Sequence, residues 1–145
     1  MTITDCYEEC TRGKSEEKIQ DRVSKDNRLL FVDDDLAILD GYRYIFEDEG
    51  YLVDVACNQS ELYQCLETHD YDAIILDYHL GQLNGVEIAK QINMVKPEVR
   101  LVFISGQKNA EEELINNGVS IAGFFMKPVK AETLLEYISS YLMEQ

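Results

Sequence analysis

The stretch Tyr71-Asp72-Ala73-Ile74-Ile75-Leu76-Asp77 decides the fold, because an uninterrupted apolar run within it ends in a carboxylate. A short apolar run of this kind is typical of a strand that is buried on both faces of a sheet. Three further apolar runs also end in polar residues: Leu29-Leu30-Phe31-Val32 before Asp33-Asp34-Asp35, Leu101-Val102-Phe103-Ile104 before Ser105, and Phe124-Phe125-Met126 before Lys127. The sequence therefore predicts polar side chains at the ends of four buried strands.

Strand-like and helix-like patterns alternate five times after Arg28. The predicted strands are 28–32, 52–56, 73–76, 101–104 and 123–126. Each strand is followed by a segment with apolar residues three and four positions apart, which indicates a helix. Strands joined by single helices require right-handed crossovers, so the sheet is parallel and helices cover both of its faces. The predicted fold class is α/β, a doubly wound domain of five strand–helix units over residues 28–145.

The predicted helices are defined by their apolar faces. These faces are Leu39, Tyr42, Ile45 and Phe46 in the first helix; Leu62, Cys65 and Leu66 in the second, which follows Ser60; Ile88, Ala89, Ile92 and Val95 in the third, which starts at Gly85; Ala110, Leu114 and Ile115 in the fourth; and Leu134, Leu135, Ile138 and Leu142 in the last. The fourth helix ends at Asn117-Gly118, a favourable C-cap.

The length of 145 residues suits one domain with a substantial core and is too short for two. The net charge of −15 argues against direct binding to nucleic acid or an anionic membrane, because like charges repel. Such a surface suits a protein that gathers divalent cations or docks on basic partners. Residues 1–27 carry few apolar side chains, which predicts a flexible, acidic and polar N-terminal arm.

The arm contains no apolar segment typical of a signal peptide, and no apolar run reaches the length of a membrane span. A cytoplasmic location without membrane insertion is therefore expected. Cys6 and Cys10 have a ligand-like spacing, but no second pair of cysteines or histidine accompanies them at the spacing of a zinc site. Cys57 and Cys65 are expected to be reduced structural thiols.

The predicted strand ends bring five polar side chains to one place. Ligands of open α/β sheets bind outside the carboxyl ends of the strands. Asp33, Asp34, Asp77, Ser105 and Lys127 should therefore meet at that edge. Carboxylates suit Mg²⁺, whereas a hydroxyl and an ammonium group suit phosphoryl oxygens. The pattern predicts a phosphate-handling site with Mg²⁺ as its cofactor.

This set of residues resembles the receiver domain of two-component response regulators, in its stand-alone form. The resemblance runs from Arg28 to Met143. The stretches that carry it are Leu29-Leu30-Phe31-Val32-Asp33-Asp34-Asp35, Tyr71-Asp72-Ala73-Ile74-Ile75-Leu76-Asp77, Asn84-Gly85, Ile104-Ser105-Gly106 and Lys127-Pro128. One acidic pair would be weak evidence, but five stretches in order are specific. The resemblance implies a flavodoxin-like fold with strand order 2-1-3-4-5, in a phosphorelay phosphoprotein that is not an enzyme.

The resemblance also implies roles for the acidic residues. Asp77 would be the phospho-acceptor, because a carboxylate can attack a phosphohistidine and hold the phosphoryl group as an acyl phosphate. Asp33 and Asp34 would recruit Mg²⁺ together with Asp77 and the main-chain carbonyl of His79. The implied donors are a histidine kinase or a histidine phosphotransfer protein.

The remaining implied residues would contact the phosphoryl group or change conformation in response to it. Lys127 would place its charge on a phosphoryl oxygen, and the family often makes the bond to Pro128 cis. Ser105 would donate its hydroxyl to another oxygen, while Phe124 would turn inward as the switch residue. The expected output face is the fourth helix, fifth strand and fifth helix, about residues 109–142, which would bind a downstream protein or a second copy.

The chain departs from the family pattern in places. His79-Leu80-Gly81-Gln82-Leu83-Asn84-Gly85 stands where a proline-glycine turn is common, and Leu36 replaces a common proline. The positions of His79 and Gln107 flank the route of a hydrolytic water in the family. Our hypothesis is that these two residues set the lifetime of the acyl phosphate.

Two other functions remain open on sequence grounds. A haloacid-dehalogenase-type phosphatase would use Asp33 and Asp35 after the first strand, but its further acidic motif would have to come from Glu132, Glu136 and Glu144. A receiver fold kept only for protein contact is the second alternative. The aspartate run could also simply cap the first helix.

Overall fold

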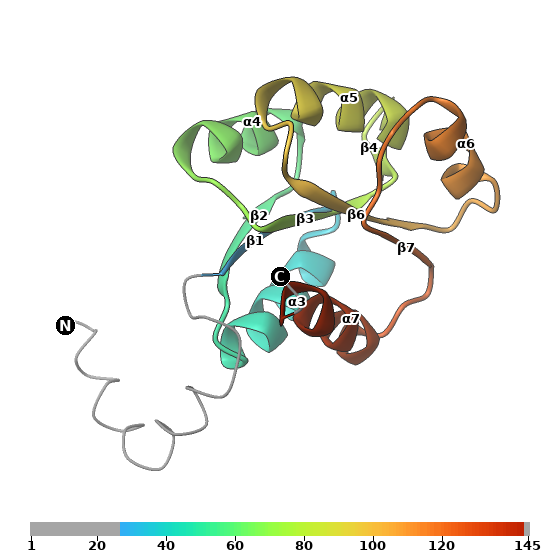
Figure 1. The fold of residues 1–145 in the computed structure, drawn as a ribbon. Coiled ribbons are helices and arrows are strands. Elements are labelled where there is room, and N and C mark those ends of the chain that lie inside the picture. The colour runs from blue at the N-terminus through green and yellow to red at the C-terminus, as the bar shows by residue number, and fades with distance from the viewer. Residues whose placement is uncertain (1–26, 144–145) are drawn as a thin grey trace, which may run out of the picture.

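Figure 1 shows the computed structural model, which describes residues 27–143. Five parallel strands form one sheet in the order β2-β1-β3-β6-β7. They are β1 (Arg28–Val32), β2 (Leu52–Ala56), β3 (Ala73–Asp77), β6 (Arg100–Ser105) and β7 (Gly123–Met126). Counted along the chain, the parallel strands have the order 2-1-3-4-5, so the predicted fold is confirmed. The predicted arm lies, apart from Asn27, outside the described residues.

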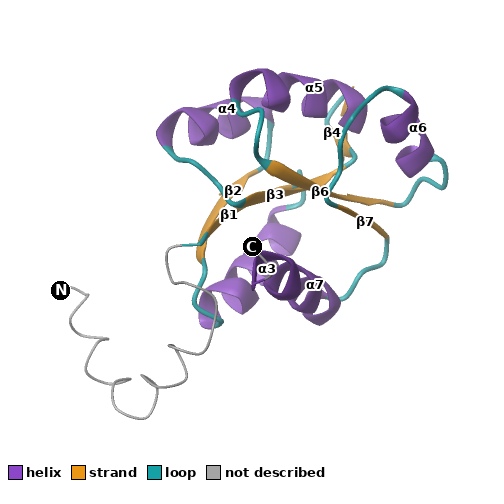
Figure 2. Cartoon of the chain, viewed as in Figure 1, coloured by secondary structure: helices purple, strands orange, loops and turns teal. Residues whose placement is uncertain are grey.

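Helices cover both faces of the sheet, with α4, α5 and α6 on one side and α3 and α7 on the other (Figure 2). Their bounds are α3 (Leu36–Asp48), α4 (Gln59–Thr68), α5 (Gly85–Val95), α6 (Ala110–Asn116) and α7 (Ala131–Met143). Within residues 27–143, none of them combines the length and the apolar character that crossing a membrane requires.

The central strands send alternate side chains into two apolar cores. On β1, Leu30 packs with residues of α4 and α5, whereas Phe31 packs with residues of α3. On β3, which pairs with both β1 and β6, Ile74 and Ile75 divide in the same way. All four side chains are buried. Burial on both faces explains why these runs are apolar throughout and why polar residues appear only where a strand ends.

The acidic run after β1 divides between two tasks. Asp35 is the N-cap of α3, and its Oδ1 accepts hydrogen bonds from the N–H groups of Ala37 (3.0 Å) and Ile38 (3.4 Å). The Ile38 N–H also donates to the main-chain carbonyl of Asp35 at 3.1 Å. The Ala37 N–H has no acceptor within the helix, so the cap stabilises the first turn. The capping interpretation therefore holds for Asp35, while Asp33 and Asp34 remain available at the edge of the sheet.

Two details of the predicted helices were wrong. α4 begins at Gln59, because Asn58 rather than Ser60 supplies its N-cap. The sequence also places Val95 and Ile115 on buried faces, whereas they are 52% and 57% exposed. Both lie in the last turn of a helix, and hydrophobic periodicity does not show how far along a helix the covering sheet extends.

An antiparallel hairpin follows β3 and has no counterpart among the predicted elements. Its strands are β4 (His79–Leu80) and β5 (Leu83–Asn84), joined through Gly81, whose φ of 61° favours glycine. Strands of two residues are too short to show a hydrophobic period. The hairpin leads directly into α5, where Asn84 serves as N-cap.

The substitution Gly85→Ala should lower the free energy of unfolding by about 1–3 kcal/mol, because it overpacks the core. A Cβ at this position would lie 2.4 Å from Cδ1 of Tyr78 and 3.0 Å from Cε1 of Phe103. Gly41→Ala, in α3, is the matched control, since nothing lies within 4 Å of its added Cβ. The control should gain roughly 0.5–1 kcal/mol from the helix preference of alanine. Urea unfolding measures both, and wild-type stability of Gly85→Ala would contradict the packing argument.

Candidate functional site

Three carboxylates gather at the carboxyl-terminal edge of the sheet, as predicted. Asp33 follows β1 and Asp77 ends β3, and these strands are paired neighbours. Oxygen atoms of Asp33, Asp34 and Asp77, which we call the acidic cluster, lie within 4.8 Å of one another. Asp33 is 7% exposed and the Asp77 side chain 11%, whereas Asp34 is exposed. Two nearly buried carboxylates thus stand beside a third at the surface.

Burial raises the pKa of Asp33 above its ordinary value, and the charges of Asp77 and Asp34 act in the same direction. The N–H of Asp35, which donates to Asp33 Oδ1 at 2.9 Å, and the nearby Lys127 ammonium oppose the rise. The acidic cluster therefore holds its negative charge against an electrostatic penalty, which a bound cation would relieve.

Lys127 follows β7, and Asp33 follows β1, so the two residues reach Asp77 from opposite sides of β3. The Nζ of Lys127 donates a hydrogen bond to Asp77 Oδ2 at 3.0 Å. Burial by itself lowers the pKa of Lys127, but the hydrogen bond to Asp77 and the charges of the acidic cluster outweigh burial and raise it. The Lys127 N–H donates to the carbonyl of Ser105 at 2.8 Å, so the backbone after β7 is fixed to β6. The lysine is therefore charged and already directed at the predicted acceptor.

Ser105 lies at the same edge, at the end of β6, and is only 2% exposed. The peptide bond between Lys127 and Pro128 beside it is cis, as the resemblance implies. A Cβ on Gly106 would lie 4.0 Å from the Lys127 Cβ, an ordinary contact. The Ser105 Oγ accepts a hydrogen bond from the N–H of Gln107 at 2.9 Å, so its own loop orients the hydroxyl.

The second oxygen of Asp77 is held by the chain that follows it. The N–H of His79 donates to Asp77 Oδ1 at 3.2 Å, and the residue itself is exposed. One carboxylate oxygen thus faces Lys127 and the other faces the β3–β4 connection. The use of the His79 main-chain carbonyl as a metal ligand stays a prediction.

Phe124, the predicted switch residue, lies on β7 in register with Phe103 of β6. Its ring is half-buried against the core on the side of α4, α5 and α6. The side chain is therefore packed partly inward, and its role as a switch stays a prediction.

The described acids that a phosphatase would need do not join the acidic cluster, and Glu144 lies outside the described residues. Asp35 caps α3, and Glu132 and Glu136 lie exposed on α7. Among residues 27–143, the acidic cluster is the only group of three side chains that could share a metal ion.

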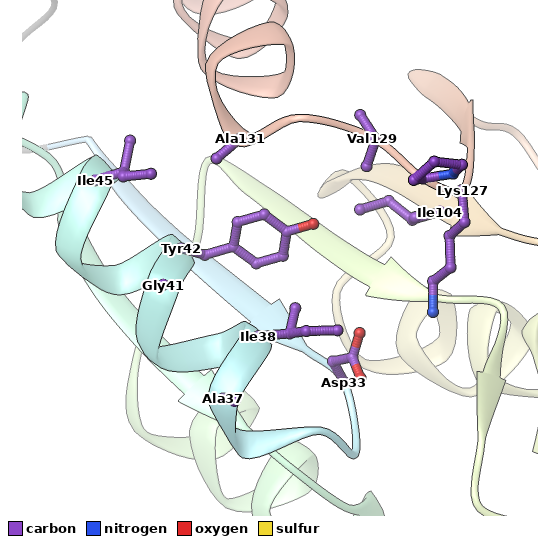
Figure 3. Close-up of a pocket in the computed structure, with 11 residues that line it drawn as sticks. Asp33, Ala37, Ile38, Gly41, Tyr42, Ile45, Ile104, Lys127, Val129 and Ala131 are labelled. Carbon is purple, nitrogen blue, oxygen red and sulfur yellow. The ribbon is translucent and has the colours of Figure 1, made fainter.

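An apolar pocket of about 400 Å³, which sequence reasoning missed, opens beside the acidic cluster between α3 and the β7–α7 connection (Figure 3). Asp33 and Lys127 line one end of it. The Tyr42 ring lines the wall and stacks on Phe31 with ring centroids 4.9 Å apart. Burial, followed by the charges of Asp33 and Asp77, raises the pKa of Tyr42. The small residues that leave this space come from two helices: Ala37, Gly41 and Ala131.

Tyr78 is a second feature that sequence reasoning missed. It directly follows Asp77, is 1% exposed, and donates its hydroxyl hydrogen bond to a carboxylate oxygen of Glu113 on α6. Burial, and then this hydrogen bond, raise the pKa of Tyr78 to about 12, so the hydroxyl keeps its proton at neutral pH. No sequence period connects residues so far apart, so only the fold reveals the contact.

Comparison with known proteins identifies one family. The model of the response regulator receiver domain matches residues 29–139. Over 110 residues the chain is 30% identical to the alginate biosynthesis transcriptional regulatory protein AlgB of Pseudomonas aeruginosa, covering 76% of this chain and 24% of that protein. Over 106 residues it is 28% identical to the aerobic respiration control protein ArcA of Escherichia coli, covering 73% and 44%. The chain thus spans less than half the length of either relative.

A solved structure with a similar fold is the response regulator receiver domain protein (CheY-like) from Methanospirillum hungatei JF-1. It is 30% identical, with a TM-score of 0.74, and the match covers 82% of this chain and 95% of that one. The family match runs from β1 into α7, and so includes the acidic cluster, Ser105 and Lys127. The chain therefore belongs to the response regulator receiver domain family.

Proposed function

We propose that this chain is a phospho-acceptor in a two-component phosphorelay. Asp77 takes a phosphoryl group from the phosphohistidine of a histidine kinase or a histidine phosphotransfer protein. The observation that carries this proposal is the setting of the Asp77 carboxylate, nearly buried, beside Asp33 and Asp34 and hydrogen-bonded to Lys127 at 3.0 Å. A carboxylate with only a structural role is not expected beside two others, because like charges repel.

In the proposed transfer, a carboxylate oxygen of Asp77 attacks the phosphorus atom. The phosphorus–nitrogen bond breaks, its electron pair passes to the imidazole, and that ring takes up a proton. The product is an acyl phosphate on Asp77. The Lys127 ammonium group can stabilise the negative charge that develops on the phosphoryl oxygens, and Ser105 can turn its hydroxyl toward one of them.

The residues present fit Mg²⁺. The acidic cluster offers three hard oxygen donors. Burial and the charges of Asp77 and Asp34 raise the pKa of Asp33, and a cation would favour its charged form. Asp33, Asp34, Asp77 and the main-chain carbonyl of His79 would hold the ion. When bound, Mg²⁺ would neutralise the carboxylates that otherwise repel an incoming phosphoryl group.

The proposed output is a change in partner binding rather than turnover of a substrate, so the chain is not proposed to be an enzyme. The expected surface comprises α6, β7 and α7, where Ile115 is 57% and Met126 44% exposed. Phosphorylation would shift the population between two packings of this surface. The two named relatives are regulatory proteins. We expect the target of this chain, a protein or a second copy, to bind to that face. Unchanged chemical shifts over residues 109–142 after phosphorylation would contradict this output.

Incubation with acetyl phosphate and Mg²⁺ should add one phosphoryl group to the chain, and Asp77→Asn should abolish the addition. Asparagine has a similar shape but lacks the nucleophilic carboxylate. Intact mass, with borohydride trapping to map the site, measures the product. Asp70→Asn is the control, because the Asp70 side chain is 91% exposed and pairs only with Lys96 among the described residues; it should label like the wild type.

The position of the label separates the alternatives. Label on Asp33 would replace the receiver chemistry with the phosphatase chemistry. Absence of label with acetyl phosphate and with a panel of phosphorylated histidine phosphotransfer proteins would favour a receiver fold kept only for protein contact.

Replacing His79 and Gln107 together by alanine should change the first-order decay rate of the acyl phosphate by about threefold or more. The His79 backbone contacts Asp77, and the Gln107 side chain is held beside the site by a 2.8 Å hydrogen bond to Asn109. Loss of phosphoryl label over time gives the rate, and Gln82→Ala, at an exposed hairpin position, serves as control. An unchanged decay rate in the double variant would reject the hypothesis.

Asp33→Asn should make the metal-free protein more stable at pH 7, because it removes a nearly buried charge that two neighbouring carboxylates repel. The folded-state pKa of Asp33 lies above its ordinary 3.8, so ionisation of Asp33 destabilises the folded state as pH rises through that window. The advantage of the variant should therefore shrink as pH falls toward 3.8. Mg²⁺ should stabilise the wild type and not the variant. Urea unfolding at several pH values tests this, and equal stabilisation of both proteins by Mg²⁺ would refute it.

A further inference from the structure

Tyr78 links the predicted acceptor to helix α6. Its backbone N–H donates to the carbonyl of Ile104 on β6 at 2.8 Å, directly beside Asp77. Its ring is buried among the α4, α5 and α6 residues of the core. Its hydroxyl donates to the Glu113 carboxylate on α6. One residue therefore touches both the strand end that carries Asp77 and the helix that begins the proposed output face.

Packing on two sides restricts the orientation of the Tyr78 ring. Its Cδ1 would be 2.4 Å from a Cβ at Gly85, so the ring packs closely against the start of α5. The ring also meets Phe103 edge-on, with centroids 6.4 Å apart and planes at 66°. Contacts on two sides aim the hydroxyl at α6, where it meets Glu113.

Glu113 differs from its acidic neighbours on α6. Glu111 and Glu112 are exposed, whereas Glu113 is half-buried next to the fully buried Leu114. A half-buried carboxylate that accepts a hydrogen bond from a hydroxyl is left without that partner when the donor is removed, which is unfavourable. The position of α6 is therefore coupled to the position of Tyr78.

We propose that Tyr78 is a positioning residue that couples the phosphorylation of Asp77 to the placement of α6 through Glu113. The proposal rests on the proposed acceptor role of Asp77. A phosphoryl group on Asp77 must replace the present contacts of its carboxylate with the His79 N–H at 3.2 Å and with Lys127 at 3.0 Å. The backbone on either side of Tyr78 therefore rearranges when the group is added.

In this proposal, the rearrangement around Asp77 breaks the Tyr78–Glu113 hydrogen bond, so the bond favours the packing without the phosphoryl group. By linkage, a contact that stabilises one state weakens the binding of a ligand that prefers the other state, and it does so by the same free energy. Removing the Tyr78–Glu113 bond should therefore make occupation of the phosphoryl site easier.

The test measures the affinity of the Mg²⁺-loaded chain for beryllium trifluoride, an analogue of the phosphoryl group, by calorimetry. Tyr78→Phe keeps the ring and removes the donor, whereas Glu113→Leu removes the acceptor from the other side. Each should bind the analogue about threefold or more tightly than the wild type, the range expected for one hydrogen bond to a charged group. Glu113→Gln keeps an acceptor oxygen and should restore affinity close to that of the wild type.

A double variant, Tyr78→Phe with Glu113→Leu, should bind no more tightly than either single variant, because both remove the same bond. Amide hydrogen exchange over residues 110–119 should also respond to the analogue less in these variants than in the wild type. A merely structural role would lower stability without this pattern of rescue and non-additivity.

Two results would overturn the inference. If the wild type is labelled at Asp77 and binds the analogue, but all variants bind it equally, the coupling through Glu113 is absent while the proposed function stands. If the wild type neither binds the analogue nor accepts a phosphoryl group, the proposed function fails and the coupling fails with it.

Discussion

The parallel pairing of β1 with β3 is the constraint on which the rest of the site depends. It sets Val32 beside Leu76, so the next residue of each strand, Asp33 and Asp77, reaches the same edge of the sheet. The two carboxylates repel each other in a place where little water reaches them. This unfavourable arrangement persists because apolar packing on both faces of the sheet holds the strand ends in position.

The positive charge that offsets this repulsion comes from a distant part of the chain. β7 pairs with β6, and the Lys127 backbone is bonded to Ser105, so the lysine side chain reaches Asp77 from the opposite side. Three neighbouring strand pairings thus assemble an acid cluster, a hydroxyl and an ammonium group. The resulting site has fixed walls and one uncompensated negative region, which suits a cation and a transferred phosphoryl group.

The same edge also leads outward to the surface where the response is expected. In the proposed switch, Ser105 and Phe124 would form one route, along β6 and β7, which the family resemblance implies. Tyr78 would form another, because it continues the chain from Asp77 and bonds to Glu113 on α6. Under the proposed function, phosphorylation of Asp77 would act on α6 and β7 together. A short helix such as α6, of seven residues, depends on such tertiary contacts for its position.

The sequence by itself determined the five strands of the parallel sheet and the residues at their ends, because a strand buried on both faces is a local apolar run. The hairpin of β4 and β5 was not predicted, because its strands are too short to show a pattern. The sequence could not separate Asp35, which caps α3, from Asp33, which joins the acidic cluster, since both follow β1 within three positions. Only the tertiary structure decided the bond between Tyr78 and Glu113, the pocket beside Tyr42 and the exposure of helix ends. Each of these depends on the meeting of residues that are distant in the chain, and no local pattern records such a meeting.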